Sequence, residues 1–117
     1  MAFKQESGAW TRYRKLPSVV EVDFHWSGEG REPGMFGYWD AMGRVHQTAL
    51  ESLEAAQEVG DRYVLFTHGW STSRQGKTTA RSIVRSLMRS PEATPYIIRK
   101  ECIQHDSVFV AAVRPLR

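Results

Sequence analysis

The stretch between residues 63 and 89 is the sequence feature that most constrains how this chain folds. An apolar run at residues 63–67 leads into a polar segment rich in glycine and serine, which gives way to a basic segment with helical spacing. α/β proteins build anion sites in this order, because backbone N–H groups at the start of a helix point at the ligand and the helix dipole favours negative charge. The stretch therefore predicts a strand, a binding loop and a helix in succession.

Length and composition indicate one globular domain. The chain has 117 residues, of which 41% are hydrophobic and 25% are charged, and a chain of this size buries roughly two-thirds of its unfolded surface without needing disulfides. Its one cysteine, Cys102, forms no internal disulfide, which favours a reducing compartment. No apolar run is long enough to span a membrane, and the N-terminal residues do not resemble a signal peptide. We therefore expect a cytoplasmic protein with no membrane partner.

Charge is unevenly distributed along the chain. Residues 1–60 contain nine acids and six bases, whereas residues 61–117 contain four acids and ten bases. Residues 74–91 contain no acid at all. The basic side chains of the helical segment recur every four residues and so form one row, at Lys77, Arg81, Arg85 and Arg89. The row predicts contact with a polyanion, with the solvated face of an amphipathic helix as the alternative.

Hydrophobic periodicity predicts a tail followed by one α/β domain. Residues 1–17 are expected to form an N-terminal tail or edge segment, and residues 18–117 the domain. The expected order is β-α-β-α-β-β, with strands at residues 18–26, 63–67, 96–99 and 108–113 and helices at residues 40–59 and 77–89. This order predicts a small two-layer sandwich with a mixed sheet.

The connections between these elements add further expectations. Residues 27–37 are rich in glycine and predict a long loop, and Gly60 and Pro91 are stop signals for the two helices. Strands joined through a helix pair in parallel, with the helices packed on the sheet. We expect the last two strands to add an antiparallel edge, with residues 100–107 as their turn and His105 solvated within it.

Polar side chains follow the first two strands of the predicted domain. Asp23 and His25 project to the same face because they lie two residues apart on a strand, and His68 follows the next strand directly. If these strands are parallel neighbours, the three side chains share the edge of the sheet where α/β proteins bind ligands. A carboxylate beside imidazoles suits general acid–base chemistry or a divalent metal such as Mg²⁺ or Mn²⁺. An Asp–His pair that only satisfies itself at a sheet edge is the alternative.

The polar loop favours a phosphate ligand. Gly76, Lys77 and Thr78 match the end of a P-loop, but Ser71 stands where the first glycine of that motif belongs, which argues against a nucleoside triphosphatase. Backbone N–H groups in such a loop can still hold a phosphate. The residues that we assign to phosphate or nucleic-acid binding are Gly69, Ser71, Ser73, Arg74, Gly76, Lys77, Arg81, Arg85 and Arg89.

Several short motifs within residues 19–114 resemble the small MutS-related (Smr) domain family. Residues 20–25 resemble its leucine-Asp-leucine-His opening strand, and residues 66–71 resemble its second strand and the glycine loop that follows. Residues 73–76 and 80–88 resemble its next glycine loop and helix. Trp26 and Ser71 stand where the family has glycine. The resemblance implies a compact α/β fold similar to the C-terminal domain of bacterial translation initiation factor 3.

The resemblance also implies a function. Smr domains bind nucleic acid, and some members nick DNA or cleave RNA. The aspartate and histidine of the family's opening strand correspond to Asp23 and His25, and its glycine loop corresponds to His68, Gly69 and Ser71. We therefore expect DNA or RNA as the partner, and whether the chain is an endonuclease stays open. The alternatives are a non-catalytic protein-interaction module and a small phosphate- or nucleotide-binding domain that uses residues 69–78.

Overall fold

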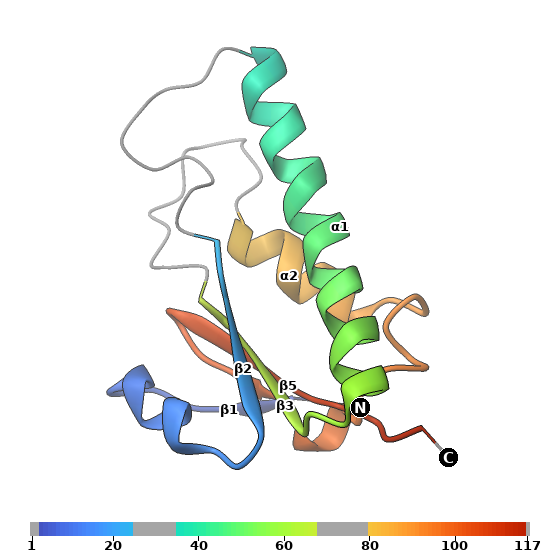
Figure 1. Ribbon diagram of the computed structural model, residues 1–117. Helices are drawn as coiled ribbons and strands as arrows, with labels where there is room; N and C mark the ends of the chain where they lie inside the picture. Colours follow the sequence, from blue (N-terminus) through green and yellow to red (C-terminus); the bar gives the residue numbers. More distant parts are fainter. Residues whose placement is uncertain (1–2, 25–34, 68–79, 117) are drawn as a thin grey trace.

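A computed structural model of the protein describes residues 3–24, 35–67 and 80–116, with residues 35–42 and 80 described as backbone only (Figure 1). The elements are β1 (Lys4–Gln5), the 3-10 helix η1 (Trp10–Lys15), β2 (Val19–Asp23), α1 (Met35–Val59), β3 (Tyr63–Thr67), α2 (Ala80–Arg89), the 3-10 helix η2 (Arg99–Glu101), β4 (Ile103–Gln104) and β5 (Val108–Ala112). From β2 onward the order of strands and α-helices is the predicted β-α-β-α-β-β, and the fold class is confirmed as a small mixed α/β fold.

The five strands form one mixed sheet in the order β1-β4-β5-β3-β2. β2 and β3 are parallel, as the crossover through α1 predicts, whereas β5 is antiparallel to both of its neighbours, β3 and β4. The last two strands, β4 and β5, are antiparallel as expected, but the expectation that they form an edge of the sheet is wrong, because both lie inside it. Every residue of β5 is buried, and a strand that is apolar at every position is best covered at the centre of a sheet.

Both α-helices cover one face of this sheet (Figure 1). Alternate residues of the central strands, such as Phe66 and Phe109, point into this core. An apolar stripe along α1 faces them, with Val45, Ala49, Leu53 and Ala56 each at most 2% exposed. Among the described residues, no helix is long and apolar enough to cross a membrane.

The end of α1 agrees with the prediction, whereas its start does not. The helix begins at Met35 rather than at residue 40, so the last three residues of the predicted 27–37 loop are helical. The other end is at Gly60, as predicted. Gly60 has a φ of +97°, and the N–H of Asp61 donates to the carbonyl oxygen of Ala56 at 2.9 Å. This is the Schellman geometry, in which a left-handed residue ends the helix at low cost only if it is glycine.

The N-terminal segment, residues 3–16, contributes the cover of the other face of the sheet (Figure 1). Tyr13 of η1 joins three residues of the central strands in a second, smaller cluster, Leu65, Val108 and Val110. At the sheet edge β1 pairs in parallel with β4, and there the ring of Phe3 packs on the helix side, edge-on against Phe109 with centroids 4.9 Å apart. Because the central strands are apolar on both faces, both faces need cover, and η1 with Leu16 supplies the second.

Residues 96–107 depart from the sequence-based expectation. Only Ile97 of the predicted strand 96–99 is paired, through an isolated bridge to Val113. Arg99 instead donates to the carbonyl oxygens of Met88 at 2.8 Å and Ser90 at 2.5 Å. A guanidinium at this place satisfies carbonyl groups at the end of α2 and complements the helix dipole. The strand forms later, as β4, within the residues 100–107 that were expected to be a turn.

Cys102 lies in the core just before β4. Its thiol accepts a hydrogen bond from the N–H of Ala112 at 3.4 Å and donates one to the carbonyl oxygen of Ile98 at 3.5 Å. Burial raises the pKa of this thiol to about 11. Its carbonyl oxygen accepts from the N–H of Lys4 at 2.9 Å, so the residue also anchors the N-terminal segment.

Candidate functional site

The carboxyl ends of β2 and β3 meet at one edge of the sheet. Asp23 pairs in register with Thr67, and the Thr67 hydroxyl donates to Oδ1 of Asp23 at 3.0 Å. The parallel pairing on which the grouping of Asp23, His25 and His68 depends is therefore present. Both histidines lie outside the described residues, so Asp23 is the one member of the group whose place is known.

The turn between β4 and β5 lies at the same edge. Val108, the first residue of β5, pairs with Thr67, so this turn is two strand spacings from β2, or roughly 10 Å. Arg81, in the first turn of α2, donates to the carbonyl oxygen of Asp106 in the turn at 3.4 Å. Figure 1 shows α2 starting at the edge where β2 and β3 end. The acidic side chain of Asp23 and the first arginine of the basic row thus belong to the same end of the molecule.

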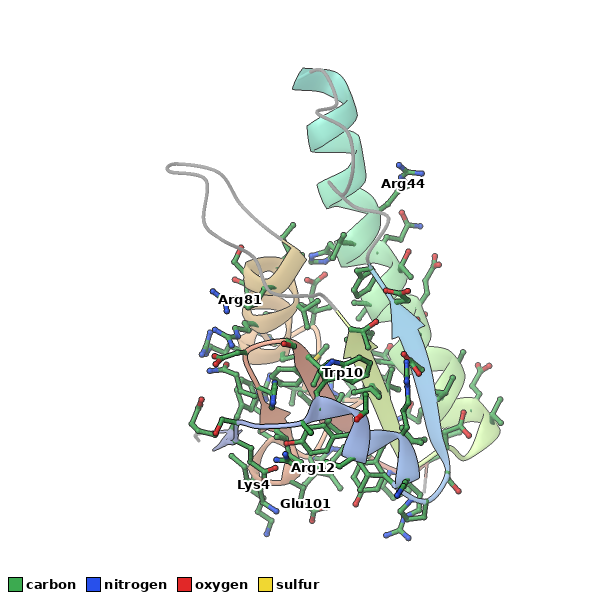
Figure 2. All side chains as sticks on the ribbon, turned by 90° about the vertical axis from the view of Figure 1, so that its left-hand side faces the viewer. Lys4, Trp10, Arg12, Arg44, Arg81 and Glu101 are labelled. Carbon is green, nitrogen blue, oxygen red and sulfur yellow. The ribbon has the colours of Figure 1, made fainter. Side chains whose placement is uncertain are left out.

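The three described members of the basic row contact one short segment, residues 104–106. Figure 2 shows the first of them, Arg81, on α2. Each arginine donates to one residue of the segment, Arg81 to the Asp106 carbonyl at 3.4 Å, Arg85 to the His105 carbonyl at 3.1 Å and Arg89 to the Gln104 side chain at 3.0 Å. Three successive turns of the helix therefore bind three consecutive residues. We call Arg81, Arg85 and Arg89 the arginine row.

All three acceptors of the arginine row are neutral oxygens. Two are backbone carbonyls and one is a side-chain amide, so the hydrogen bonds orient the guanidinium groups without cancelling their charge. Within the described part of the chain, none of the three forms an ion pair with a carboxylate. Burial lowers the pKa of Arg85, and the charge of Arg81 lowers it further, partly offset by Asp106. The arginine row is a set of repelling cations held in place.

His105 is buried, at 4% exposed, so the expectation that it is solvated is wrong. Its Nδ1 accepts from the N–H of Ser107 at 3.0 Å, which places the ring proton on Nε2, and Nε2 donates to the carbonyl oxygen of Gly8 at 2.9 Å. The N-terminal segment thereby fixes the residue whose carbonyl Arg85 binds. No local pattern could reveal this contact, because Gly8 and His105 are 97 residues apart.

The arginines of the N-terminal segment have carboxylate partners instead. Arg12 contacts Glu6 at 3.0 Å, and Arg14 forms a two-pronged pair with Glu21 at 2.9 and 3.1 Å. Tyr13 also donates to Glu6. Burial, followed by this hydrogen bond to Glu6, raises the pKa of Tyr13 to about 12. Arg12, on η1, lies below Arg81 in Figure 2.

Most of the predicted loop residues lie outside the described residues. These are Gly69, Ser71, Ser73, Arg74, Gly76 and Lys77, together with His25 and His68. Within residues 3–24, 35–67 and 80–116, no group of three or more His, Cys, Asp or Glu side chains could hold a metal ion. The Mg²⁺ or Mn²⁺ site expected at Asp23, His25 and His68 therefore stays a prediction.

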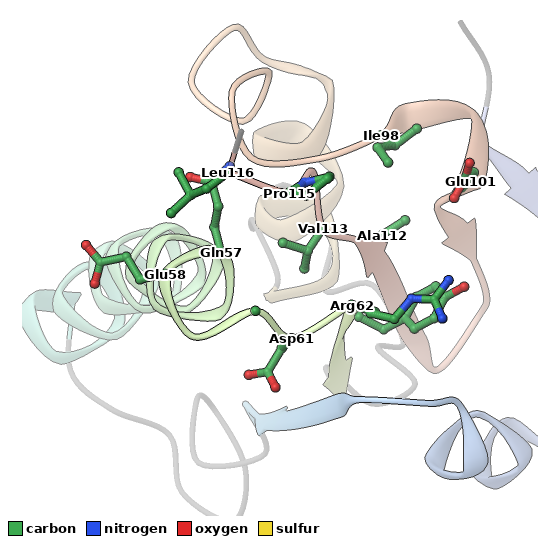
Figure 3. Close-up of a pocket in the computed structure, with 12 residues that line it drawn as sticks. Gln57, Glu58, Asp61, Arg62, Ile98, Glu101, Ala112, Val113, Pro115 and Leu116 are labelled. Carbon is green, nitrogen blue, oxygen red and sulfur yellow. The ribbon is translucent and has the colours of Figure 1, made fainter.

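A separate cavity of about 470 Å³ lies at the other end of the sheet, where α1 ends and β3 begins (Figure 3). Its charged lining is Glu58, Asp61, Arg62 and Glu101. Figure 3 shows Glu58 and Glu101 on opposite sides, pointing away from each other. The carboxylates of Glu58 and Glu101 therefore do not converge on one point in this cavity.

Comparison with known proteins adds no family. No protein-family model matches the chain. No curated protein matches it, and no solved structure matches it either.

Proposed function

We propose that the protein is a nucleic-acid-binding domain that holds a sugar–phosphate chain against α2 and the loop before it. The arginine row carries this proposal, because neutral oxygens orient its guanidinium groups and leave their charge available to a ligand. Side chains four residues apart on a helix recur about every 6 Å along its axis. Such a row suits a ligand with anions at repeated intervals, which is the chemistry of DNA and RNA.

A small phosphate compound fits the same surface less well. A single phosphate is bound tightly when its donors converge on one point. The first and last arginines of the row are instead eight positions apart on the helix, or about 12 Å. An extended polyanion uses all three cations, whereas one phosphate uses one or two. The motif resemblance to Smr domains agrees with the nucleic-acid proposal.

Salt-dependent binding tests this proposal. If Lys77 and the arginine row each neutralise one phosphate, the logarithm of the association constant should fall with the logarithm of salt concentration at a slope of about −3.6 on duplex DNA. Raising salt from 50 to 200 mM then weakens binding by roughly two orders of magnitude. The measurement is fluorescence anisotropy with labelled duplex and single-stranded oligonucleotides of DNA and RNA. A slope near zero on every one of them contradicts the proposal.

Cleavage of the bound strand is a second proposed function, supported by the position of Asp23. Its carboxylate is held by the Thr67 hydroxyl at the edge that also carries Arg81. In this proposal Asp23 orients His25 as general base or acid, and Arg81 neutralises charge that develops on the phosphate. Mg²⁺ or Mn²⁺ bound beside Asp23 would supply Lewis-acid stabilisation of that charge.

Plasmid nicking and RNA cleavage test the second function. Supercoiled plasmid and structured RNA are incubated with the protein, with and without Mg²⁺ or Mn²⁺, and run beside the Asp23→Asn variant. Products that form with the wild type and not with the variant support cleavage at this edge. Intact substrate in every lane removes the cleavage proposal and leaves the binding proposal standing.

A further inference from the structure

The arginine row is continued across the sheet by two glutamines. Arg89 donates from Nη2 to Oε1 of Gln104 at 3.0 Å, and Gln104 donates from Nε2 to Oε1 of Gln5 at 3.1 Å. Gln5 and Gln104 are partners in the parallel β1–β4 register, which holds their side chains on the same face. A chain of hydrogen bonds thus leads from α2 over β4 to β1, at the edge of the sheet.

Arg89 fixes the direction of every hydrogen bond in this series. A guanidinium only donates, so the atom of Gln104 that faces Arg89 must be the oxygen, and the amide nitrogen of Gln104 then faces Gln5. Gln5 must present its own oxygen to that nitrogen. Its amide NH₂ group is therefore free to donate elsewhere, and Gln5 is exposed. No other described residue accepts from it.

We propose that Gln104 and Gln5 extend the nucleic-acid surface from α2 to β1, with Gln5 as a neutral hydrogen-bond donor to the sugar–phosphate chain. This inference rests on the proposed function. An ionised phosphate oxygen only accepts, so it requires a donor of the kind that Gln5 offers. Bonds in a chain that begins at a cation polarise one another, which strengthens the last donor.

The amide at position 104 has a second role, because it positions Arg89 while leaving the cation uncancelled. Gln104 is 8% exposed, so it holds Arg89 from inside the fold. A carboxylate in the same place would bind Arg89 at least as well and would remove its charge from the surface. The two roles make separable predictions, because Gln5 contributes no charge and Gln104 controls one.

The first test replaces Gln5 with alanine and measures oligonucleotide affinity by anisotropy over a salt series. We expect Gln5→Ala to weaken binding about three- to tenfold, the range for the loss of one typical, solvent-exposed hydrogen bond. The salt slope should stay unchanged, because a neutral contact releases no counterion. The matched control is Gln47→Ala, which removes an exposed glutamine from α1 and should leave affinity and slope as in the wild type.

The second test is Gln104→Glu, which keeps the size of the side chain and gives Arg89 a carboxylate. The salt slope should become shallower by about 0.7 on single strands or 0.9 on duplex, the contribution of one phosphate contact. Thermal unfolding should show that the variant is folded, since a new pair with Arg89 replaces the old hydrogen bond. A purely structural glutamine would leave the slope unchanged.

The outcomes distinguish this inference from the proposed function. If the wild type shows no salt-dependent binding, the proposed function fails and the inference falls with it. If the wild type binds and Arg85→Gln weakens binding, while Gln5→Ala and Gln104→Glu both match the wild type, only the inference is overturned. Weaker binding at constant slope for Gln5→Ala, together with a shallower slope for Gln104→Glu, supports it.

Discussion

The molecule contains two sets of arginines that differ in what they bind. Arg12 and Arg14, on η1, contact the carboxylates of Glu6 and Glu21. The arginine row on α2 contacts two carbonyls and one amide. Each set has its partners within hydrogen-bonding distance, so both are ordered by the fold. Within the described residues, only the second set forms no ion pair, because its acceptors are neutral oxygens that orient a cation without pairing with its charge.

This difference separates arginines that hold the fold together from those suited to a ligand. Two bonds of Arg12 reach the carbonyls of Ser7 and Ala9, so it also ties the N-terminal segment into its own turn. Net charge does not reveal the distinction, since both sets consist of exposed or half-exposed arginines. The hydrogen-bond partners reveal the distinction, and each set of arginines can be tested by substitution.

The largest expected effect is the loss of nucleic-acid affinity when the arginine row is neutralised. Replacing Arg81, Arg85 and Arg89 together with glutamine should make the salt slope on duplex shallower by about 2.7 and weaken binding at 50 mM salt by on the order of a hundredfold. The measurement is the anisotropy titration described above. The double variant Arg12→Gln/Arg14→Gln should change affinity less than about twofold. Equal losses of affinity in the triple and double variants would show that nucleic acid does not prefer the arginine row to the arginines of η1.

The next effect is on stability, and here the N-terminal arginines should matter more than the arginine row. Arg12→Gln should lower the free energy of unfolding by about 1 to 1.5 kcal/mol, because it removes several partly exposed hydrogen bonds of the N-terminal segment. Arg81→Gln, which removes one long hydrogen bond at the surface, should cost less than about 0.5 kcal/mol. Urea denaturation measures both. A larger loss for Arg81→Gln would indicate that the arginine row is structural.

A smaller effect is the pH dependence of stability that Tyr13, next to Arg12 and Arg14 on η1, should produce. The folded-state pKa of Tyr13 is raised from 10.0 to about 12, so the fold favours the neutral phenol. The stability that this provides is fully present below pH 10 and is lost as pH rises toward 12. Between these pH values the wild type should lose about 1 kcal/mol more than Tyr13→Phe. A loss in Tyr13→Phe equal to that of the wild type would contradict the role of Tyr13.

The smallest expected effect belongs to the pair between Arg14 and Glu21. Both side chains are substantially exposed, at 53% and 33%, so solvent screens their attraction. A double-mutant cycle with Arg14→Gln and Glu21→Gln should give a coupling energy of about 0.2 to 1 kcal/mol. Added salt should reduce it further. A coupling above 2 kcal/mol would mean that this pair resembles a buried ion pair.

The elements that could be predicted from the sequence are those with a local signal. β3 matches its predicted bounds of 63–67, because five apolar residues between polar segments indicate a buried strand. The end of α2 at Arg89 is also correct, since the prediction of a helix to residue 89 followed from the stop signal of Pro91. β4 was missed because it is two residues long, and its pairing depends on β5 and β1 rather than on its own composition.

In the candidate site, too, only the residues with a local signal could be predicted from the sequence. Spacing alone indicates the arginine row, and the strand ends indicate the place of Asp23. The acceptors on residues 104–106 could not be predicted, since a carbonyl oxygen is the same in every residue. The link from Gln104 to Gln5 spans 99 positions of the chain, and isolated glutamines carry no local signal.

Cys102 gives this protein a chemical reporter of its own opening. Thiol reagents attack the thiolate, and this side chain is fully buried with a pKa near 11. Labelling of the native protein must therefore wait for a fluctuation that exposes the thiol. Because the thiol lies in the core between Ile98 and Ala112, the labelling rate under native conditions reports how often this part of the core opens. That rate can be followed without adding any probe to the sequence.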